Sequence, residues 1–279
     1  MHSRVEAFHR MLDRARAARG LALMGVCNIT PDSFSDGGRY HAPDAARARI
    51  DELLAEGADI VDIGGESTRP GAPEVPAAEQ KERVLDAIGY AAARDACVSI
   101  DTTNPEVAAA AFEAGASILN DASCLRDEGL ARAAAAARGA VILMHTRGTP
   151  ADMHGFSRYP DGGYDDVVRD VCAEWAAAAE RLRSAGVPDG AIVMDPGLGF
   201  AKNARQSIEL LRRLPEVVAA VRVPVTVGAS RKSFLASVDP FTIFGPHAKP
   251  STSAGAWRGN RPCSRASSTS SPSARSGAC

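Results

Sequence analysis

Residues 97–121 read CVSIDTTNPEVAAAAFEAGASILND and decide the fold class of the chain. A short apolar run ends at Asp101, an Ala-rich helical stretch follows, and a second apolar run ends at Asn120 and Asp121. Short apolar runs without alternation are typical of parallel strands that are buried on both faces. The stretch therefore predicts one strand–helix–strand unit of an α/β protein.

The same unit recurs along most of the chain. Apolar runs predict strands at Leu21–Cys27, Ile60–Ile63, Cys97–Ile100, Ser117–Leu119, Ala140–Met144, Ile192–Met194 and Val225–Val227. Helices are predicted between them, near residues 43–56, 77–94, 105–114, 127–138, 164–185 and 203–214. Gly57, Gly115 and Gly139 each stand between a helix and the next strand, where glycine commonly forms a left-handed cap.

The length of 279 residues is about that of one α/β barrel, so a single barrel domain is expected. Residues 1–20 are assigned to an N-terminal helix packed on the barrel, and residues 21–239 to the barrel itself. Residues 240–279 are rich in Ser, Pro, Gly and Arg, and neither an eighth strand nor a final helix can be recognised there. This tail is expected to be disordered, because such a composition buries too little apolar surface to fold alone.

Charge and composition narrow the class of partner. The net charge of −2 argues against nucleic acid or an anionic membrane as the main partner, because either would favour a basic face. The sequence contains no apolar run of the ~18 residues that a membrane span requires. The 6 cysteines form no CxxC pair and no signal peptide is recognised, which favours reduced thiols in a cytoplasmic protein.

Polar residues follow the predicted strands at the ends where they leave the sheet. They are Asn28, the segment 66–69, Asp101, Asn120 and Asp121, His145, Asp195, and the segment 230–232. In barrels and open α/β sheets, ligands bind at this carboxyl end of the strands. Asn, Asp and Ser are also common helix N-caps, but that role does not explain Arg69, His145 or Lys232.

Two of these segments are suited to an anion. Arg69 stands beside Pro70 and Gly71, and its guanidinium offers a planar fork to phosphate oxygens. Arg231 and Lys232 stand where a helix is expected to begin, so charge and helix dipole would act together. The long polar loop within residues 24–38 is typical of a lid over a site.

These motifs together resemble the dihydropteroate synthases. The segments Met24–Gly38, Gly64–Gly71, Asp195–Phe200 and Ser230–Lys232 carry the resemblance, which covers roughly residues 20 to 236. It implies a (β/α)8 TIM barrel that joins 6-hydroxymethyl-7,8-dihydropterin pyrophosphate to p-aminobenzoate in folate biosynthesis. It also implies Mg2+ as cofactor and a homodimer as the assembly.

The resemblance assigns roles to individual residues. Asp101, Asn120 and Asp195 are expected to accept the pterin N–H groups, and Lys232 to reach the carbonyl side of the ring. Met144 and Phe200 would pack the ring beside Gly228, and Asn28 would bind the magnesium. Thr68, Arg69, Pro70 and Ser233 would contact p-aminobenzoate or the phosphates, and Arg69 and Lys232 are the expected catalytic residues. For His145 a structural role is favoured over that of a base.

The end of the chain departs from the family. Its eighth strand carries an Arg-x-His pair that grips pyrophosphate, and the residues after Asp239 contain no such pair, since Gly245 stands two residues before His247. This leaves open an impaired enzyme or a non-catalytic pterin-binding relative. A methyltetrahydrofolate–corrinoid methyltransferase should lack the Ser230–Lys232 cluster, and a generic phosphate-binding barrel leaves the acceptors Asp101 and Asp195 unexplained.

Overall fold

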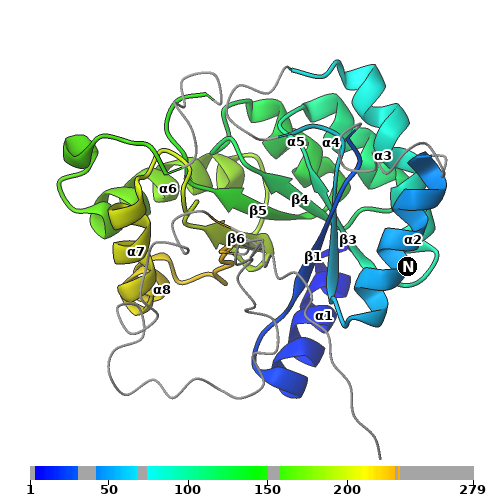
Figure 1. Cartoon of the computed structure of the whole chain (residues 1–279), viewed down its shortest axis with the longest axis horizontal. Helices are drawn as coiled ribbons and strands as arrows, with labels where there is room; N and C mark the ends of the chain where they lie inside the picture. Colours follow the sequence, from blue (N-terminus) through cyan, green and yellow to red (C-terminus); the bar gives the residue numbers. More distant parts are fainter. Residues whose placement is uncertain (1–3, 31–41, 68–73, 150–156, 230–231, 233–279) are drawn as a thin grey trace, which may run out of the picture.

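The computed structural model describes residues 4–30, 42–67, 74–149, 157–229 and 232. Parallel strands form one sheet in sequence order, and each connection between neighbours contains at least one helix (Figure 1). The strands are β1 (Met24–Asn28), β2 (Ile60–Gly64), β3 (Cys97–Asp101), β4 (Ile118–Asp121), β5 (Ala140–Met144) and β6 (Ile192–Asp195). The predicted α/β architecture is confirmed.

Helices α2 (Ala42–Ala55), α3 (Ala77–Ala92), α4 (Pro105–Ala114), α5 (Glu128–Ala137) and α6 (Val167–Ser184) connect successive strands. Every residue of β2 and β5 is buried. Burial on both faces is what their mainly apolar sequences, with Asp62 of β2 as the exception, predict for parallel strands of an α/β sheet.

The predicted strand at Val225–Val227 is reduced to a single bridge. Val225 pairs with Met194 in parallel, and the Met194 N–H donates to Pro224 O at 2.9 Å. The Thr226 N–H donates back to Met194 O at 2.8 Å, while Pro224 has no N–H with which to extend the ladder on the amino side of this bridge. Within the described parts of the chain the sheet therefore has six strands and is not closed into a full barrel. Residues 233–279, and with them the predicted tail, lie outside the described residues.

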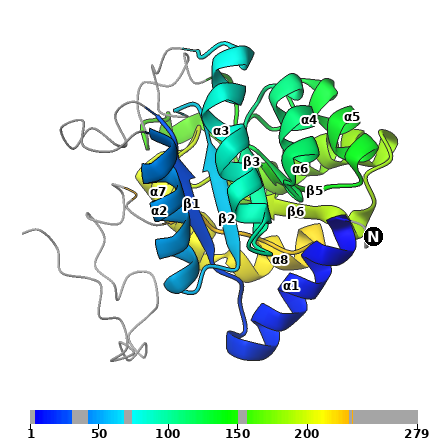
Figure 2. The ribbon, with the colours of Figure 1, turned by 90° about the vertical axis from the view of Figure 1, so that its right-hand side faces the viewer.

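Helix α1 (Arg4–Arg19) crosses the amino ends of the strands (Figure 2). Phe8 and Met11 are buried beneath it. The Arg4 guanidinium donates to Phe112 O at 2.8 Å, Ala116 O at 3.1 Å and Ala137 O at 2.8 Å. One side chain thus satisfies carbonyls at the ends of α4 and α5 and ties the N-terminal helix to the sheet.

Two of the three predicted glycine caps are confirmed and the third is wrong in detail. Gly57 and Gly115 have φ of 93° and 121°. At the third joint Arg138, with φ 51°, takes the left-handed conformation instead of Gly139. Gly139 is required for close approach, because a Cβ on it would lie 2.3 Å from a ring carbon of Phe112.

The last predicted helix, near residues 203–214, is confirmed, and a further helix that was not predicted follows it directly. Helix α7 (Ala204–Arg212) ends before Arg213, and α8 (Leu214–Val221) begins at once with Pro215 in its first turn. Proline fits there because the first helical N–H groups have no partner within the helix. Pro215 was the sequence signal for this break. The short turns η3 (Asp161–Gly163) and η4 (Asp189–Ala191) flank α6.

Candidate functional site

The carboxyl ends of β1 to β4 bring four of the strand-end residues into one row. Asn28 is the register partner of Gly64, Gly64 of Asp101, and Asp101 of Asn120. A Cβ built on Gly64 would lie 3.0 Å from Asn28 Oδ1 and 3.5 Å from Asp101 Oδ2. The glycine therefore leaves space in which two oxygen-bearing side chains approach each other.

A buried carboxyl group supports this row from inside the sheet. Asp62, in the middle of β2, is 3% exposed, and the Asn120 side-chain amide donates to its Oδ2 at 3.0 Å. The amide nitrogen of Asn120 is thereby engaged. Its oxygen is the atom left to accept a hydrogen bond from a ligand.

Asp101 carries the strongest sign of a ligand site on this side. Its Oδ1 is buried and has no hydrogen-bond partner among the described residues. Burial, then the neighbouring carboxyl groups of Asp62, Asp121 and Glu66, raise the pKa of Asp101 well above its usual range. A buried acceptor without a donor is costly, so a ligand that supplies N–H groups would relieve it.

A second group of residues lies on the adjacent strands β5 and β6. Met144 is the register partner of Asp195, and the Gly197 N–H donates to Asp195 Oδ1 at 2.7 Å. A Cβ on Gly228 would lie 4.0 Å from Asp195 Oδ2, so the backbone of Gly228 passes beside this carboxylate. Burial raises the pKa of Asp195, while the Gly197 N–H and the charges of Lys232 and Lys202 oppose that rise.

Lys232, the last residue that the structure describes, also belongs to this second group. Its ammonium donates to Leu198 O at 2.9 Å and lies 4.2 Å from the centre of the Phe200 ring. The contact with the ring face is a cation–π interaction. Burial lowers the pKa of Lys232, and the negative charge of Asp195 opposes this. A cation, an aromatic ring and a carboxylate thus share one corner of the sheet edge.

Comparison with known proteins shows the family to which the chain belongs. Residues 24–254 match the family described as pterin binding enzyme. The chain belongs to the pterin-binding enzyme family.

Several proteins to which the chain is similar are dihydropteroate synthases. The Mycobacterium leprae dihydropteroate synthase is 46% identical over 214 residues, which cover 76% of this chain and 74% of that protein. A probable bifunctional folylpolyglutamate synthase/dihydropteroate synthase of Haloferax volcanii is also 46% identical, but the match spans only 25% of its length. The Xanthomonas albilineans dihydropteroate synthase solved with 4-aminobenzoic acid superimposes with a TM-score of 0.70 at 39% identity, covering 80% of each chain.

The structure places the site residues expected from the family resemblance in two neighbouring groups. Asn28, Asp101 and Asn120 form the first, and the second is made up of Met144, Asp195, Phe200, Gly228 and Lys232. Both lie at the carboxyl edge of one sheet, on strands that neighbour each other. Thr68, Arg69, Pro70 and Ser233 lie outside the described residues, as do Arg231 and most of the long first loop.

Sequence reasoning missed Asp62, although a signal existed. An acidic residue in the middle of a fully apolar strand is unusual and points to a buried polar partner. It also left Lys202 without a role. Lys202 is fully buried, and its Nζ lies 2.9 Å from His145 Nδ1. His145 lies in the interior as well, and its Nε2 contacts Glu174 Oε2 at 3.0 Å.

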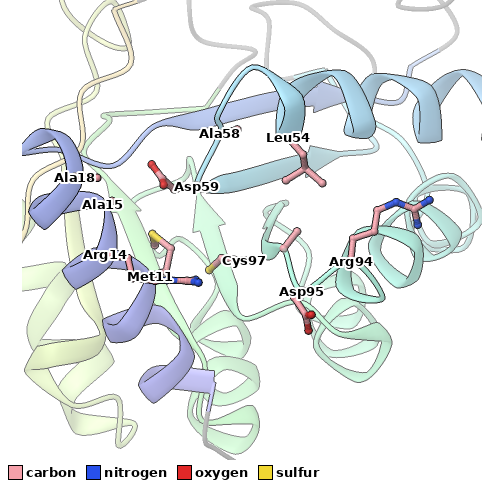
Figure 3. Close-up of a pocket in the computed structure, with 11 residues that line it drawn as sticks. Met11, Arg14, Ala15, Ala18, Leu54, Ala58, Asp59, Arg94, Asp95 and Cys97 are labelled. Atoms are coloured by element: carbon pink, nitrogen blue, oxygen red, sulfur yellow. The ribbon is translucent and has the colours of Figure 1, made fainter.

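A cavity of about 330 Å3 lies at the opposite end of the sheet (Figure 3). It opens between α1 and the start of β3, and Met11, Asp59 and Cys97 line it. Burial raises the pKa of the Cys97 thiol to about 12, so this group stays protonated. Asp101 stands at the other end of the same strand, roughly 13 Å away, so the cavity is not part of the candidate site.

Four cysteines lie within the described residues. Cys27, Cys97, Cys124 and Cys172 are free thiols. None of the helices in the described ranges combines the length and the apolar character needed to cross a membrane.

Proposed function

We propose that this protein is a dihydropteroate synthase, a transferase that condenses 6-hydroxymethyl-7,8-dihydropterin pyrophosphate with p-aminobenzoate. The products are 7,8-dihydropteroate and pyrophosphate. The observation that carries the proposal is the buried Oδ1 of Asp101, which has no hydrogen-bond partner among the described residues. Asp101 is in register with Asn120, at the sheet edge that also holds Asp195 and Lys232. Family membership and relatives at 46% identity support the same reaction.

Pterin recognition follows from the polarity of the two residue groups. A pterin presents amino and ring N–H donors along one edge, and the carboxylates of Asp101 and Asp195 with the oxygen of Asn120 supply acceptors. Charge-assisted hydrogen bonds of this kind discriminate strongly between ring systems. On the other edge, the Lys232 ammonium serves the ring carbonyl, while Phe200 and Met144 cover the ring faces.

The chemical step separates charge. The bond from the pterin methylene carbon to the pyrophosphate oxygen breaks, and a bond from the p-aminobenzoate nitrogen to that carbon forms. The nitrogen loses one proton, and pyrophosphate leaves with the electron pair. The ring that Asp101 and Asp195 hold can delocalise the positive charge that develops on it, and their carboxylates stabilise that charge.

The leaving anion requires cations, for which we propose Arg69 with Lys232 and Mg2+. Asn28 would hold the magnesium. Its side chain is exposed at the carboxyl end of β1, and a neutral oxygen ligand suits an ion whose remaining ligands are substrate phosphates and water. The described residues contain no cluster of three acidic, His or Cys groups that could hold a metal without substrate. When bound, the ion would neutralise charge on the departing pyrophosphate.

Release of pyrophosphate in the presence of both substrates tests the activity. We expect release that depends on p-aminobenzoate and on Mg2+, and 7,8-dihydropteroate as the co-product. Binding of the pterin pyrophosphate without release would favour the second candidate, a non-catalytic pterin-binding relative. The absence of an Arg-x-His pair after Asp239 is the observation that favours it. A cytoplasmic homodimer, the expected form, is checked by sedimentation of the purified chain and fractionation of the cell.

A further inference from the structure

The loop that leaves β6 is held from its buried side by a lysine that the proposed reaction does not use. Lys202 has no exposed surface, and its Nζ contacts Gly197 O at 3.2 Å, Phe200 O at 3.1 Å and His145 O at 3.3 Å. A fully buried lysine is rare because transfer of an ammonium group out of water is costly. All three of these partners are hydrogen-bond acceptors, which is the environment that an ammonium group requires.

The fourth partner of Lys202 is Nδ1 of His145, whose ring is oriented by Glu174 and, through it, by Arg147. Burial, and then the charge of Lys202, lower the pKa of His145 to about 4, so its ring is neutral. Its Nε2 donates to Glu174 Oε2 at 3.0 Å, which leaves Nδ1 as an acceptor for Lys202 at 2.9 Å. Glu174 itself is held ionised by Arg147, and then by His145, which lower its pKa to about 2.

The loop has little freedom between these contacts. Gly197 has φ 66°, and a Cβ on it would lie 2.0 Å from His145 O. The Gly199 N–H donates to the Ser207 hydroxyl at 3.1 Å, and on the other side of the loop Leu198 O accepts from Lys232 at 2.9 Å. Lys202 therefore fixes the carbonyls of Gly197 and Phe200. Lys232 binds the carbonyl of Leu198 in the same short turn.

We propose that Lys202 is a positioning residue, which acts through the carbonyls of Gly197 and Phe200 to hold the Asp195 carboxylate and the Phe200 ring in the geometry that binds the pterin. The proposal rests on the proposed function for the identity of the ligand. It does not rest on it for the loop itself. Burial lowers the pKa of Lys202 to about 7, and the negative charge of Asp195 opposes this drop.

The test compares Lys202→Met with Lys81→Met. Methionine fills a similar volume without charge, and replacing a buried charge by an apolar side chain is often neutral for stability. Lys81 lies on α3 and makes an ion pair with Glu106 at 3.5 Å, remote from the β6 loop. The Lys81 variant therefore makes the same chemical change outside the site.

Two readouts separate positioning from mere folding. The first is hydrogen exchange of the Gly197 and Gly199 amides without ligand, which we expect to accelerate in Lys202→Met and to stay unchanged in Lys81→Met. The second is the dissociation constant of the pterin pyrophosphate by calorimetry, which we expect to rise by about tenfold to a hundredfold, with the KM for p-aminobenzoate unchanged. Lys202→Gln, which restores one donor group, should recover part of both effects.

Each failure has a distinct meaning. Unchanged exchange at Gly197 and Gly199 in folded Lys202→Met overturns the inference, whatever the ligand is. An equal loss of affinity for both substrates overturns it as well, because that outcome marks a general structural role. If Lys202→Met does not fold, Lys202→Gln is measured in its place by the same criteria. Wild-type protein that binds no pterin overturns the proposed function, while the exchange result still decides the role of Lys202 in the loop.

Discussion

At the scale of single residues, the buried carboxyl group of Asp101 lowers the folding stability of the protein but is expected to favour ligand binding. A carboxyl group whose pKa is raised in the folded state binds protons more tightly there than in the unfolded chain. Its stabilising contribution is complete below the unfolded pKa and is lost as the pH rises through the folded pKa. Above the unfolded pKa, the raised pKa of Asp101 therefore lowers the stability of the ligand-free protein.

Asp101→Asn is expected to stabilise the empty protein at neutral pH by on the order of 1 kcal/mol and to weaken pterin binding by about 1.5–3 kcal/mol. In the wild type, pterin affinity should fall as the pH falls below the raised pKa of Asp101, with proton release on binding. Thermal denaturation measures the change in stability. Calorimetry in buffers of different ionisation enthalpy measures the pterin affinity and the proton release. Asp86→Asn, a change at an exposed carboxylate on α3 that pairs with Arg47, is the control. Pterin affinity that Asp101→Asn leaves intact would refute the assignment.

Gly197 makes a second residue-scale prediction. Alanine at this position would adopt a positive φ and collide with His145 O, so Gly197→Ala should destabilise the protein by at least about 2 kcal/mol. Gly89→Ala is the matched control, because nothing lies within 4 Å of a Cβ placed there, inside helix α3. That change should stabilise by about 0.5–1 kcal/mol. Urea unfolding of both variants measures the change in the free energy of unfolding. Equal changes in the two variants would contradict the steric argument.

At the scale of elements, helix α7 is stabilised by its N-cap residue, Asn203. The Asn203 side chain accepts from the Gln206 N–H at 2.9 Å, and the Gln206 side chain returns a bond to the Asn203 N–H at 2.9 Å. In this reciprocal capping box the Asn203 N–H donates to Gln206 Oε1 and the Gln206 N–H to Asn203 Oδ1, so two amide donors that the helix itself leaves unpaired are satisfied. Because α7 follows directly on Lys202, the cap also bounds the β6 loop.

Asn203→Ala is expected to lower stability by about 1–2 kcal/mol, since the cap acceptor is lost. Asn203 also donates to Tyr159 O at 3.1 Å and Asp161 Oδ1 at 2.9 Å, which adds to the loss. Asn203→Asp keeps the acceptor and should recover most of the capping contribution. Thermal midpoints of the three proteins give the comparison; an alanine variant as stable as the wild type would show that the cap contributes nothing.

The elements were largely predictable from local pattern, and the exceptions have physical causes. Apolar runs between Ala-rich stretches located the six strands of the described sheet because parallel strands are buried on both faces. The predicted strand Val225–Val227 forms only one bridge, and Pro224 cannot extend the ladder on the amino side of that bridge. At the site, family likeness pointed to Asp101, Asn120 and Asp195. The partner of Asn120 could not be read from local pattern, because its bond to Asp62 joins residues 58 positions apart.

At the scale of the whole molecule, residues 240–279 differ in composition from the rest of the chain. A chain shortened to residues 1–239 is expected to keep the thermal midpoint and the pterin affinity of the full chain, because the Ser, Pro, Gly and Arg composition of residues 240–279 buries little apolar surface. Scanning calorimetry and pterin titration of both chains measure this. A lower midpoint in the shortened chain would assign residues 240–279 to the folded domain.

The hydrogen bond from Asn120 to Asp62 has a consequence for which ring systems the site accepts. An isolated amide can rotate by half a turn and offer a ligand either its NH2 or its oxygen at little cost. With the nitrogen committed to a buried carboxylate, that choice is removed before any ligand arrives. A heterocycle with an oxo group in place of the exocyclic amine would bring its own oxygen against the amide oxygen and the Asp101 carboxylate. We therefore expect the ligand-free protein to discriminate against such heterocycles before any closure around the ligand.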